Sequence, residues 1–149
     1  MISLKFSEFM AGQYDDRVED HELYILTAES CVLYIGISSQ DIWNRWFTSI
    51  GSHMRQSYSL KGKDPRWKYS SDAGEAVVRC FPESLNWIIE LWTMEDCLSS
   101  LNESERMGRT NPKRIIDIER MMINKLRPAF NIMGVSYQTN FDDLPESIK

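Results

Sequence analysis

Two short apolar runs near the start of the chain constrain its fold more than any other feature. They cover residues 23–26 and 32–37, and the five residues between them have the length and composition of a hairpin connection. Because side chains alternate along a strand, Tyr24 shares a side with Leu26, and Tyr34 also projects from a defined side of the sheet. The sequence therefore predicts a β-hairpin that carries both tyrosines.

The length of the chain suits one compact domain. Of its 149 residues 42% are apolar, which leaves little room for two separate cores. We expect an N-terminal helix or arm over residues 1–21, a domain over 22–131 and a C-terminal tail over 132–149. Apolar runs stay shorter than the roughly 18 residues of a membrane helix, so we expect a soluble protein with no membrane partner.

Three cysteines bear on the cellular compartment. Cys31, Cys80 and Cys97 form no CxxC or CxxH pattern and are odd in number. The residues after Met1 also lack the apolar core of a signal peptide. These features favour a cytoplasmic protein whose cysteines are ordinary core residues.

Helical spacing and turn chemistry predict the other elements. A helix should follow the N-cap candidates of residues 38–41, because apolar residues from Ile42 to Met54 recur at helical spacing. Glycine, proline and serines predict a loop over 56–71. Further along we expect a helix over 73–81, a strand over 85–92, a helical or irregular insertion over 95–108 and a helix over 113–126. The predicted fold class is α/β (α+β), a single domain with a small, three-stranded, mainly antiparallel sheet flanked by helices.

A carboxylate interrupts the apolar face of the last predicted helix, which should begin at Asn111 and Pro112. Five apolar residues define that face by their spacing: Ile115, Ile116, Met122, Ile123 and Leu126. Glu119 lies among them. Burial of a carboxylate is costly unless it is paired, hydrogen-bonded or bound to a metal. A glutamate paired with an arginine or a tyrosine is the simpler interpretation, and a metal ligand is the alternative.

The order of these features resembles the GIY-YIG nuclease superfamily over about residues 22–131. The matching residues are Tyr24 in a degenerate first motif, Tyr34 in an intact Tyr-Ile-Gly motif, Arg45 in the following helix, Glu119 in the late helix and Asn131 in a closing aromatic-Asn element. Ser49 occupies a position where many members have a histidine. The nearest histidine, His53, would lie two turns beyond Arg45 and roughly 80° around the helix. We expect His53 to be a surface residue or a phosphate contact.

The resemblance implies a GIY-YIG-like fold and a metal-dependent endonuclease that hydrolyses DNA phosphodiester bonds, with low or structure-based specificity. Glu119 would bind Mg²⁺ (or Mn²⁺), which prefers carboxylate oxygen. Arg45 would neutralise charge that develops on the phosphoryl oxygens. Tyr24 or Tyr34 would orient or deprotonate the attacking water. Asn131 would order the site through hydrogen bonds.

The charge distribution leaves room for DNA as a partner, double- or single-stranded. The formal net charge of −5 argues against nucleic acid at first, but residues 45–79 and residues 109–127 each carry a local net charge of +4. The candidate DNA-binding residues are Arg55, Lys61, Lys63, Arg66, Lys68, Lys113 and Arg114. Trp67 or Tyr69 would stack on an unpaired base.

Two other functions compete with the nuclease interpretation. The principal alternative is a catalytically silent GIY-YIG module that binds nucleic acid or a protein partner, which the degenerate first motif, Ser49 and the acidic total favour. The other is a small regulatory or inhibitory protein. Residues 83–105 hold six carboxylates and no basic residue, and would provide an acidic surface for a protein partner.

Overall fold

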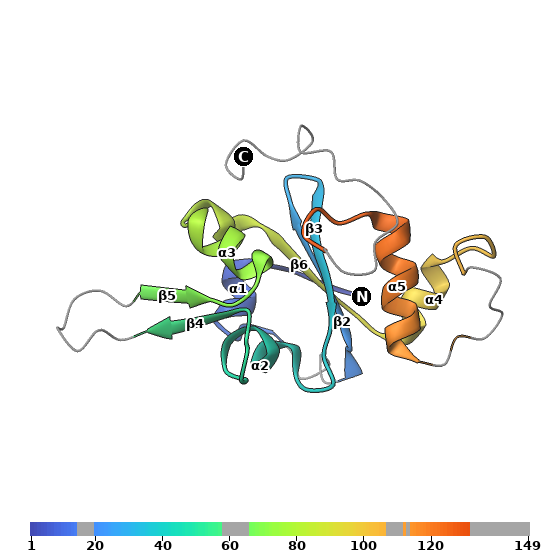
Figure 1. The fold of residues 1–149 in the computed structure, drawn as a ribbon, viewed down its shortest axis with the longest axis horizontal. Helices are drawn as coiled ribbons and strands as arrows, with labels where there is room; N and C mark the ends of the chain where they lie inside the picture. Colours follow the sequence, from blue (N-terminus) through green and yellow to red (C-terminus); the bar gives the residue numbers. More distant parts are fainter. Residues whose placement is uncertain (15–19, 58–65, 107–111, 113, 132–149) are drawn as a thin grey trace.

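The computed structural model describes residues 1–14, 20–57, 66–106, 112 and 114–131. An antiparallel sheet with the strand order β1-β6-β2-β3 lies at its centre (Figure 1). Its strands are β1 (Ile2–Lys5), β6 (Ile88–Trp92), β2 (Leu23–Ala28) and β3 (Cys31–Ile37). A ribbon of β4 (Met54–Ser57) and β5 (Arg66–Tyr69) lies apart from this sheet. The predicted α+β class is confirmed, with four strands in the central sheet instead of three.

The predicted β-hairpin is formed by β2 and β3. Tyr24 pairs with Gly36 and Leu26 pairs with Tyr34, so the two tyrosines are diagonal neighbours on one side of the sheet. The connecting turn uses positive φ angles at Glu29 and at Ser30, as tight hairpin turns require. The hairpin thus fixes the positions of both tyrosines.

The N-terminal residues belong to the sheet and its core. In β1, Ile2 pairs with Leu91 of β6, and the short helix α1 (Phe6–Met10) follows directly. Phe6 and Phe9 are fully buried. The prediction of a helix or arm over 1–21 anticipated the helix but not the edge strand, because four residues give too little alternation to reveal one.

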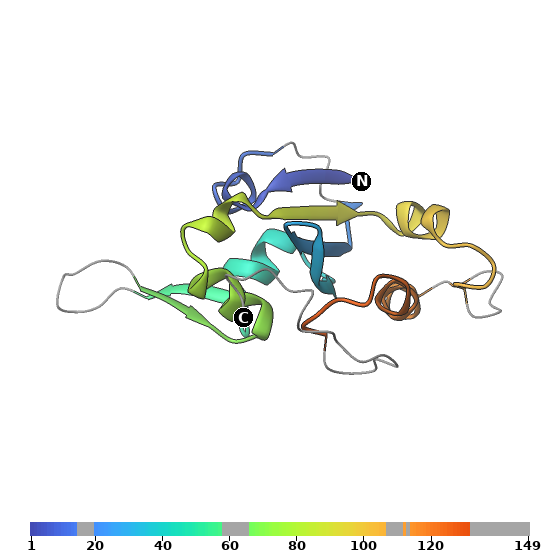
Figure 2. The ribbon, with the colours of Figure 1, turned by 90° about the horizontal axis from the view of Figure 1, so that it is seen from above.

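Helices cover both sides of the sheet (Figure 2). One side carries α1, α2 (Ile42–Phe47), α3 (Asp72–Arg79) and the 3-10 helix η2 (Glu83–Asn86), whose apolar residues form a first core. The other side carries α4 (Met94–Ser100) and α5 (Ile115–Leu126), which form a second core. Cys80 is buried in the first core and Cys97 in the second, as expected of core residues. Within the described part of the chain, no helix is long and apolar enough to cross a membrane.

The helix predicted from Ile42 to Met54 is much shorter, because α2 ends at Phe47. Its start is as predicted, since the Asp41 side chain accepts a hydrogen bond from the Trp43 N–H at 2.8 Å. After Phe47, a left-handed Gly51 turns the chain and Met54 opens β4.

The loop predicted over 56–71 is also wrong at its ends. Residues 56–57 and 66–69 belong to the β4–β5 ribbon, which packs against α2 and α3. Residues 58–65 lie outside the described residues.

Helix α5 begins later than predicted and presents a different face to the core. It starts at Ile115 after Arg114 and not at Pro112, while Asn111 lies outside the described residues. Ile116 is 48% exposed, whereas Ile118 and Met121 are buried. The buried face is therefore rotated relative to the predicted one, and Glu119 lies half-buried at its border.

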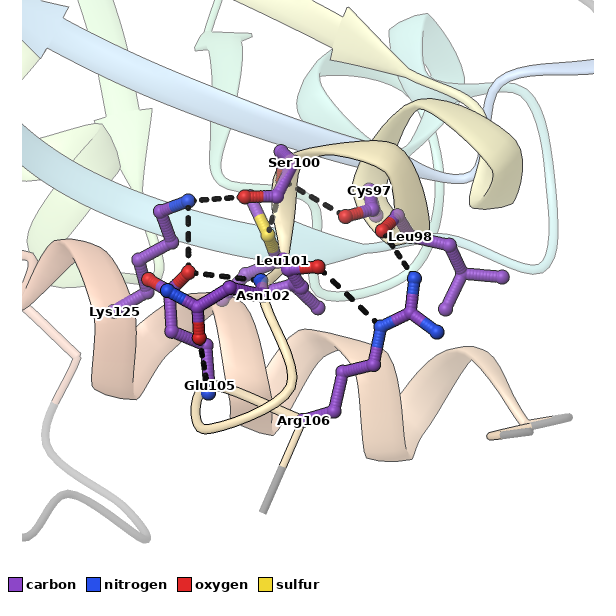
Figure 3. Close-up of polar contacts among 9 residues, drawn as sticks. Cys97, Leu98, Ser100, Leu101, Asn102, Glu105, Arg106 and Lys125 are labelled. Atoms are coloured by element: carbon purple, nitrogen blue, oxygen red, sulfur yellow. Dashed lines mark hydrogen bonds and ion pairs between the residues drawn. The ribbon is translucent and has the colours of Figure 1, made fainter. Parts of the chain in front are cut away.

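The predicted insertion over 95–108 begins as helix α4, and a polar cluster then joins its end to α5 (Figure 3). Lys125 donates to the Ser100 carbonyl and forms an ion pair with Glu105 at 3.3 Å. Asn102 and Glu105 accept each other's backbone N–H at 2.8 and 3.0 Å. Arg106 donates to the carbonyls of Leu98 and Leu101. This α4–α5 cluster satisfies main-chain groups that the end of a helix leaves without intrahelical partners.

Candidate active site

The two tyrosines form the centre of the candidate site. Tyr24 is 1% exposed, and its ring stacks on that of the partly buried Tyr34 with centroids 6.1 Å apart. Gly36 makes room for this arrangement, because a Cβ there would lie 2.4 Å from the Cζ and the hydroxyl oxygen of Tyr24. The residue that approaches Gly36 closely is thus Tyr24 itself.

His53 is buried beside Tyr24, which contradicts the expected surface position. Its Nε2 lies 2.5 Å from the Tyr24 hydroxyl oxygen and its Nδ1 lies 2.6 Å from Ser71 Oγ. The ring also packs on Trp46, with centroids 4.4 Å apart. The prediction failed because it continued α2 to Met54, whereas the chain leaves the helix after Phe47 and returns His53 to the sheet.

Helix α3 completes this chain of hydrogen bonds. Ser71 caps α3, since its Oγ accepts from the Gly74 N–H at 3.1 Å. Gly74 also permits the contact between α3 and the chain at His53, because a Cβ would lie 2.0 Å from the His53 carbonyl oxygen. Tyr24 is buried and needs an acceptor, whereas Ser71 is partly exposed. We therefore assign the His53 proton to Nδ1, so that Tyr24 donates to Nε2 and Nδ1–H donates to Ser71.

The pKa values in this buried chain favour neutral side chains. Burial raises the pKa of Tyr24 well above its usual value, and the neighbouring Tyr34 adds to this effect. Burial lowers the pKa of His53 to about 3, and the positive charge of Arg45 acts in the same direction. Near neutral pH, Tyr24 and His53 therefore share a hydrogen bond without forming an ion pair.

Arg45 and Glu119 both act electrostatically on the tyrosines. Burial raises the pKa of Tyr34, the Arg45 charge lowers it and the Glu119 charge raises it again, and the same two charges act on Tyr24. The Arg45 guanidinium is anchored by donating from Nη1 to the Gly51 carbonyl at 2.8 Å. Arg45 and Glu119 thus both lie close enough to the two tyrosines to act on their pKa values.

Access to the four residues differs. Arg45 lines a surface pocket of about 590 Å³ together with residues 37–40 and 48–51, and neither tyrosine nor Glu119 belongs to its wall. Tyr24 is sealed in the first core, while Tyr34 and Glu119 are partly exposed. Of Tyr24 and Tyr34, only Tyr34 can therefore be reached by solvent or a substrate.

Glu119 has the properties expected of a ligand for a hard cation. Among the described residues it makes no hydrogen bond and no ion pair. Burial raises its pKa, with Arg120 opposing. A cation beside the carboxylate would reverse that shift, and Mg²⁺ commonly binds through one or two carboxylates while it keeps several waters. The described residues contain no group of three or more His, Cys, Asp and Glu side chains that could hold a metal without such waters.

Asn131 covers the outer edge of β3. Its Oδ1 accepts from the Ile35 N–H at 2.9 Å and its Nδ2 donates to the Ile35 carbonyl at 2.7 Å. The backbone N–H groups of Ala129 and Phe130 also donate to β3. The segment after α5 thus protects an open sheet edge and fixes the backbone next to Tyr34.

The predicted DNA-binding residues divide into three groups. Arg55 and Lys68 are exposed and line a pocket of about 310 Å³, together with the 43% exposed Tyr69. Arg114 donates two hydrogen bonds to the Asp117 carboxylate, at 3.0 and 3.2 Å, at the start of α5. The remaining candidates are Lys61, Lys63 and Lys113, which lie outside the described residues, and Arg66, whose side chain does so too.

The structure separates the two aromatic candidates for base stacking. Trp67 packs against Phe47 and Phe81, with ring centroids 6.2 and 6.3 Å away. Trp67 is half-buried by these contacts and is therefore a poorer candidate for base stacking than Tyr69. Tyr69 retains an exposed ring.

The acidic segment 83–105 is partly neutralised within the chain. Asp96 pairs with the N-terminal amino group at 2.9 Å, and Glu105 pairs with Lys125. Glu83, Glu95 and Glu103 are exposed and keep the segment acidic on its surface.

Sequence reasoning missed His53 and Ser71 as members of the site. The available signal was the alternation of Met54, Arg55, Trp67 and Lys68, which indicates a two-stranded ribbon and would have ended α2 early. Comparison of the chain with protein-family models, with curated proteins and with solved structures found no match.

Proposed function

We propose that this protein is a metal-dependent endonuclease that hydrolyses DNA phosphodiester bonds with low or structure-based specificity. The observation that carries the proposal is the half-buried Glu119, which has no hydrogen bond or ion pair among the described residues and whose charge acts on Tyr24 and Tyr34 in opposition to that of Arg45. A buried carboxylate without a partner is costly, and divalent cation binding would remove that cost. The resemblance to GIY-YIG nucleases in the order of these residues supports the same function.

The proposed roles follow from exposure and charge. Tyr34, the accessible phenol, would orient the attacking water, and the buried Tyr24 would hold the Tyr34 ring in place. Arg45 would stabilise negative charge on the phosphoryl oxygens as the bond to the leaving oxygen breaks. Glu119 would hold Mg²⁺ (or Mn²⁺), and the bound cation would polarise the scissile phosphate.

The raised pKa of Tyr34 determines how the cleavage rate should depend on pH. At neutral pH its hydroxyl keeps the proton, so it orients water as a neutral group, whereas proton abstraction requires the tyrosinate. If Tyr34 is the base, the cleavage rate should rise steadily with pH from 6 to 9, about tenfold per pH unit, as the tyrosinate fraction grows. A rate that levels off below pH 8 would assign the base to another group.

The second candidate is a catalytically silent module that binds nucleic acid or a protein partner. Tyr24 favours this candidate, because it is buried and its hydroxyl is hydrogen-bonded to His53. A tyrosine in such a position stabilises the core whether or not the protein is an enzyme. The exposed carboxylates of segment 83–105 would serve a protein partner, and Arg55 and Lys68 would serve DNA. A cytoplasmic location belongs to both proposals.

Cleavage of supercoiled plasmid and of single-stranded DNA with Mg²⁺ or Mn²⁺ tests the proposal. We expect nicking or cleavage by the wild type, loss of both in Glu119→Ala and in the isosteric Glu119→Gln, and full activity in the matched control Glu105→Gln. A wild type that cuts neither substrate would refute the enzyme, and a Glu119→Ala variant that cuts equally well would refute Glu119 as its metal ligand. Binding of DNA without cleavage would support the silent module.

A further inference from the structure

An isoleucine at the tip of the turn between α2 and β4 is fully exposed. Ile50 is 100% exposed, and it lies on the wall of both surface pockets, the one beside Arg45 and the one lined by Arg55 and Lys68. Scattered exposed apolar residues are common on proteins. The unusual feature is that Ile50 lies between two pockets that each have a cationic side chain in the wall.

The turn that presents Ile50 is held firmly. The Gly51 carbonyl accepts hydrogen bonds from Arg45 Nη1 at 2.8 Å and from Ser70 Oγ at 3.2 Å. Ser70 Oγ also donates to the Ser52 carbonyl at 2.5 Å, and the Ser52 N–H donates to the Ser49 carbonyl. The exposed side chain is thus fixed to the same backbone that anchors Arg45.

The cations beside Ile50 face each other across the ribbon. Arg55 of β4 and Lys68 of β5 are directly opposite in the register, both are exposed, and neither forms an ion pair with another described residue. Like charges in directly opposite positions destabilise a pair of strands. An anion bound between them would remove this repulsion, and a backbone phosphate of DNA has the charge and the oxygen acceptors to do so.

We propose that the Arg55–Lys68 pocket binds a DNA backbone phosphate while Ile50 inserts between adjacent base pairs as an apolar wedge. Wedges of this kind unstack a base step and kink the duplex, and they favour DNA that is already easy to unstack. The substrate class is therefore duplex DNA with a bulge, mismatch or nick. This inference deepens the proposed function and rests on it for the choice of DNA, and Ile50 would select the site next to Arg45.

Binding in EDTA separates this inference from catalysis. Fluorescence anisotropy would compare a fully paired duplex with the same duplex carrying a one-nucleotide bulge, and 2-aminopurine beside the bulge would report unstacking. Ile50→Ala should weaken binding of the bulged duplex about tenfold, change binding of the paired duplex less than about twofold, and abolish the 2-aminopurine signal. The matched control is Ile116→Ala, the same change at another exposed isoleucine, which should bind both duplexes as the wild type does.

The charge pair has its own readout. Arg55→Gln with Lys68→Gln should reduce the slope of log affinity against log salt by about 1 to 2, whereas Lys5→Gln on the distant strand β1 should leave it unchanged. Equal binding of the bulged duplex by Ile50→Ala and wild type, or tighter binding of duplex RNA than of DNA, would overturn the wedge even if plasmid cleavage succeeds. If the wild type neither binds nor cleaves DNA, both the wedge and the proposed function fail.

Discussion

The two sides of the sheet differ in where their polar side-chain clusters lie, inside the core on one side and at its border on the other. On the first side, Tyr24, His53 and Ser71 form a chain of side-chain hydrogen bonds that reaches into an apolar core. On the second side, the α4–α5 cluster lies at the border of its core and mainly satisfies main-chain groups at the end of α4 (Figure 3). Buried polar side chains add little to the stability of a core, because the free energy lost in desolvation is about as large as the free energy gained from their hydrogen bonds. We therefore expect substitutions in the first cluster to change activity as well as stability, and substitutions in the second to change stability alone.

The largest effect expected of a single substitution comes from filling the space that Tyr24 occupies. In Gly36→Ala the new Cβ would lie 2.4 Å from two atoms of the Tyr24 side chain, which is enclosed by other rings and cannot move cheaply. We expect the free energy of unfolding to fall by about 3 kcal/mol, measured by urea denaturation. Cleavage should be lost even under conditions where the variant is folded.

A second glycine provides the control for this change. Gly12 has a φ of +71° but nothing within 4 Å of its hypothetical Cβ. Gly12→Ala should therefore cost only the backbone strain of about 1 kcal/mol and should leave cleavage intact. Equal losses in the two variants would show that Tyr24 is not tightly enclosed.

Acid should destabilise the first side through His53. Its folded pKa of about 3 lies below the unfolded value of 6.5, mainly because of burial. The neutral histidine therefore contributes its full stability above pH 6.5, and this is lost as the pH falls from 6.5 towards 3, by roughly 5 kcal/mol at most. His53→Gln should be about 2 kcal/mol less stable than the wild type at pH 7. Because the wild type loses more than this difference in acid, the two stabilities should become equal at about pH 5 and reverse below it. A constant difference from pH 7 to pH 4 would contradict the buried neutral histidine.

The N-caps of α3 and α4 allow the two sides of the sheet to be compared through equivalent substitutions. Ser71 caps α3 and also contacts His53, whereas Thr93 caps α4 by accepting from the Asp96 N–H and contacts no such chain. Thr93→Ala should cost about 1 kcal/mol and Ser71→Ala about 2 kcal/mol, measured by thermal denaturation. Only Ser71→Ala should alter the rate of cleavage. Equal costs for the two caps would show that the bond to His53 contributes nothing to stability.

The smallest effect is expected in the α4–α5 cluster. Lys125→Met keeps the length of the side chain but removes the donor to Ser100 and the ion pair with Glu105. Because the pair is partly exposed, the melting temperature should fall by only about 2 °C. DNA cleavage and binding should match the wild type, and a loss of activity would show that the second side also takes part in function.

The hairpin and its tyrosines were predictable because their signals are local. Residues 23–26 and 32–37 form two apolar runs around a short connection, and the Asp41 cap follows from side-chain chemistry next to helix α2. Glu119 was singled out by its apolar neighbours, although the buried face of α5 is rotated from the predicted one.

The rest of the site depends on contacts that a pattern does not encode. The end of α2 is set by a turn in which the His53 N–H donates to the Arg45 carbonyl, and the predicted helix hid both that turn and the role of His53. The strand β1 forms because its backbone pairs with that of β6 at the edge of the sheet. The half-buried position of Trp67 likewise depends on Phe47 and Phe81, which are distant in the sequence.

Binding of Mn²⁺ observed by NMR is the most direct test of a metal site at Glu119, because the paramagnetic ion broadens the signals of nearby amides. Substoichiometric Mn²⁺ should broaden the amides around Glu119 and Tyr34. Glu119→Gln should abolish this broadening, and Glu105→Gln in the α4–α5 cluster should leave it unchanged. Broadening centred on residues 102–106, or broadening that persists around Tyr34 in Glu119→Gln, would contradict a metal site at Glu119.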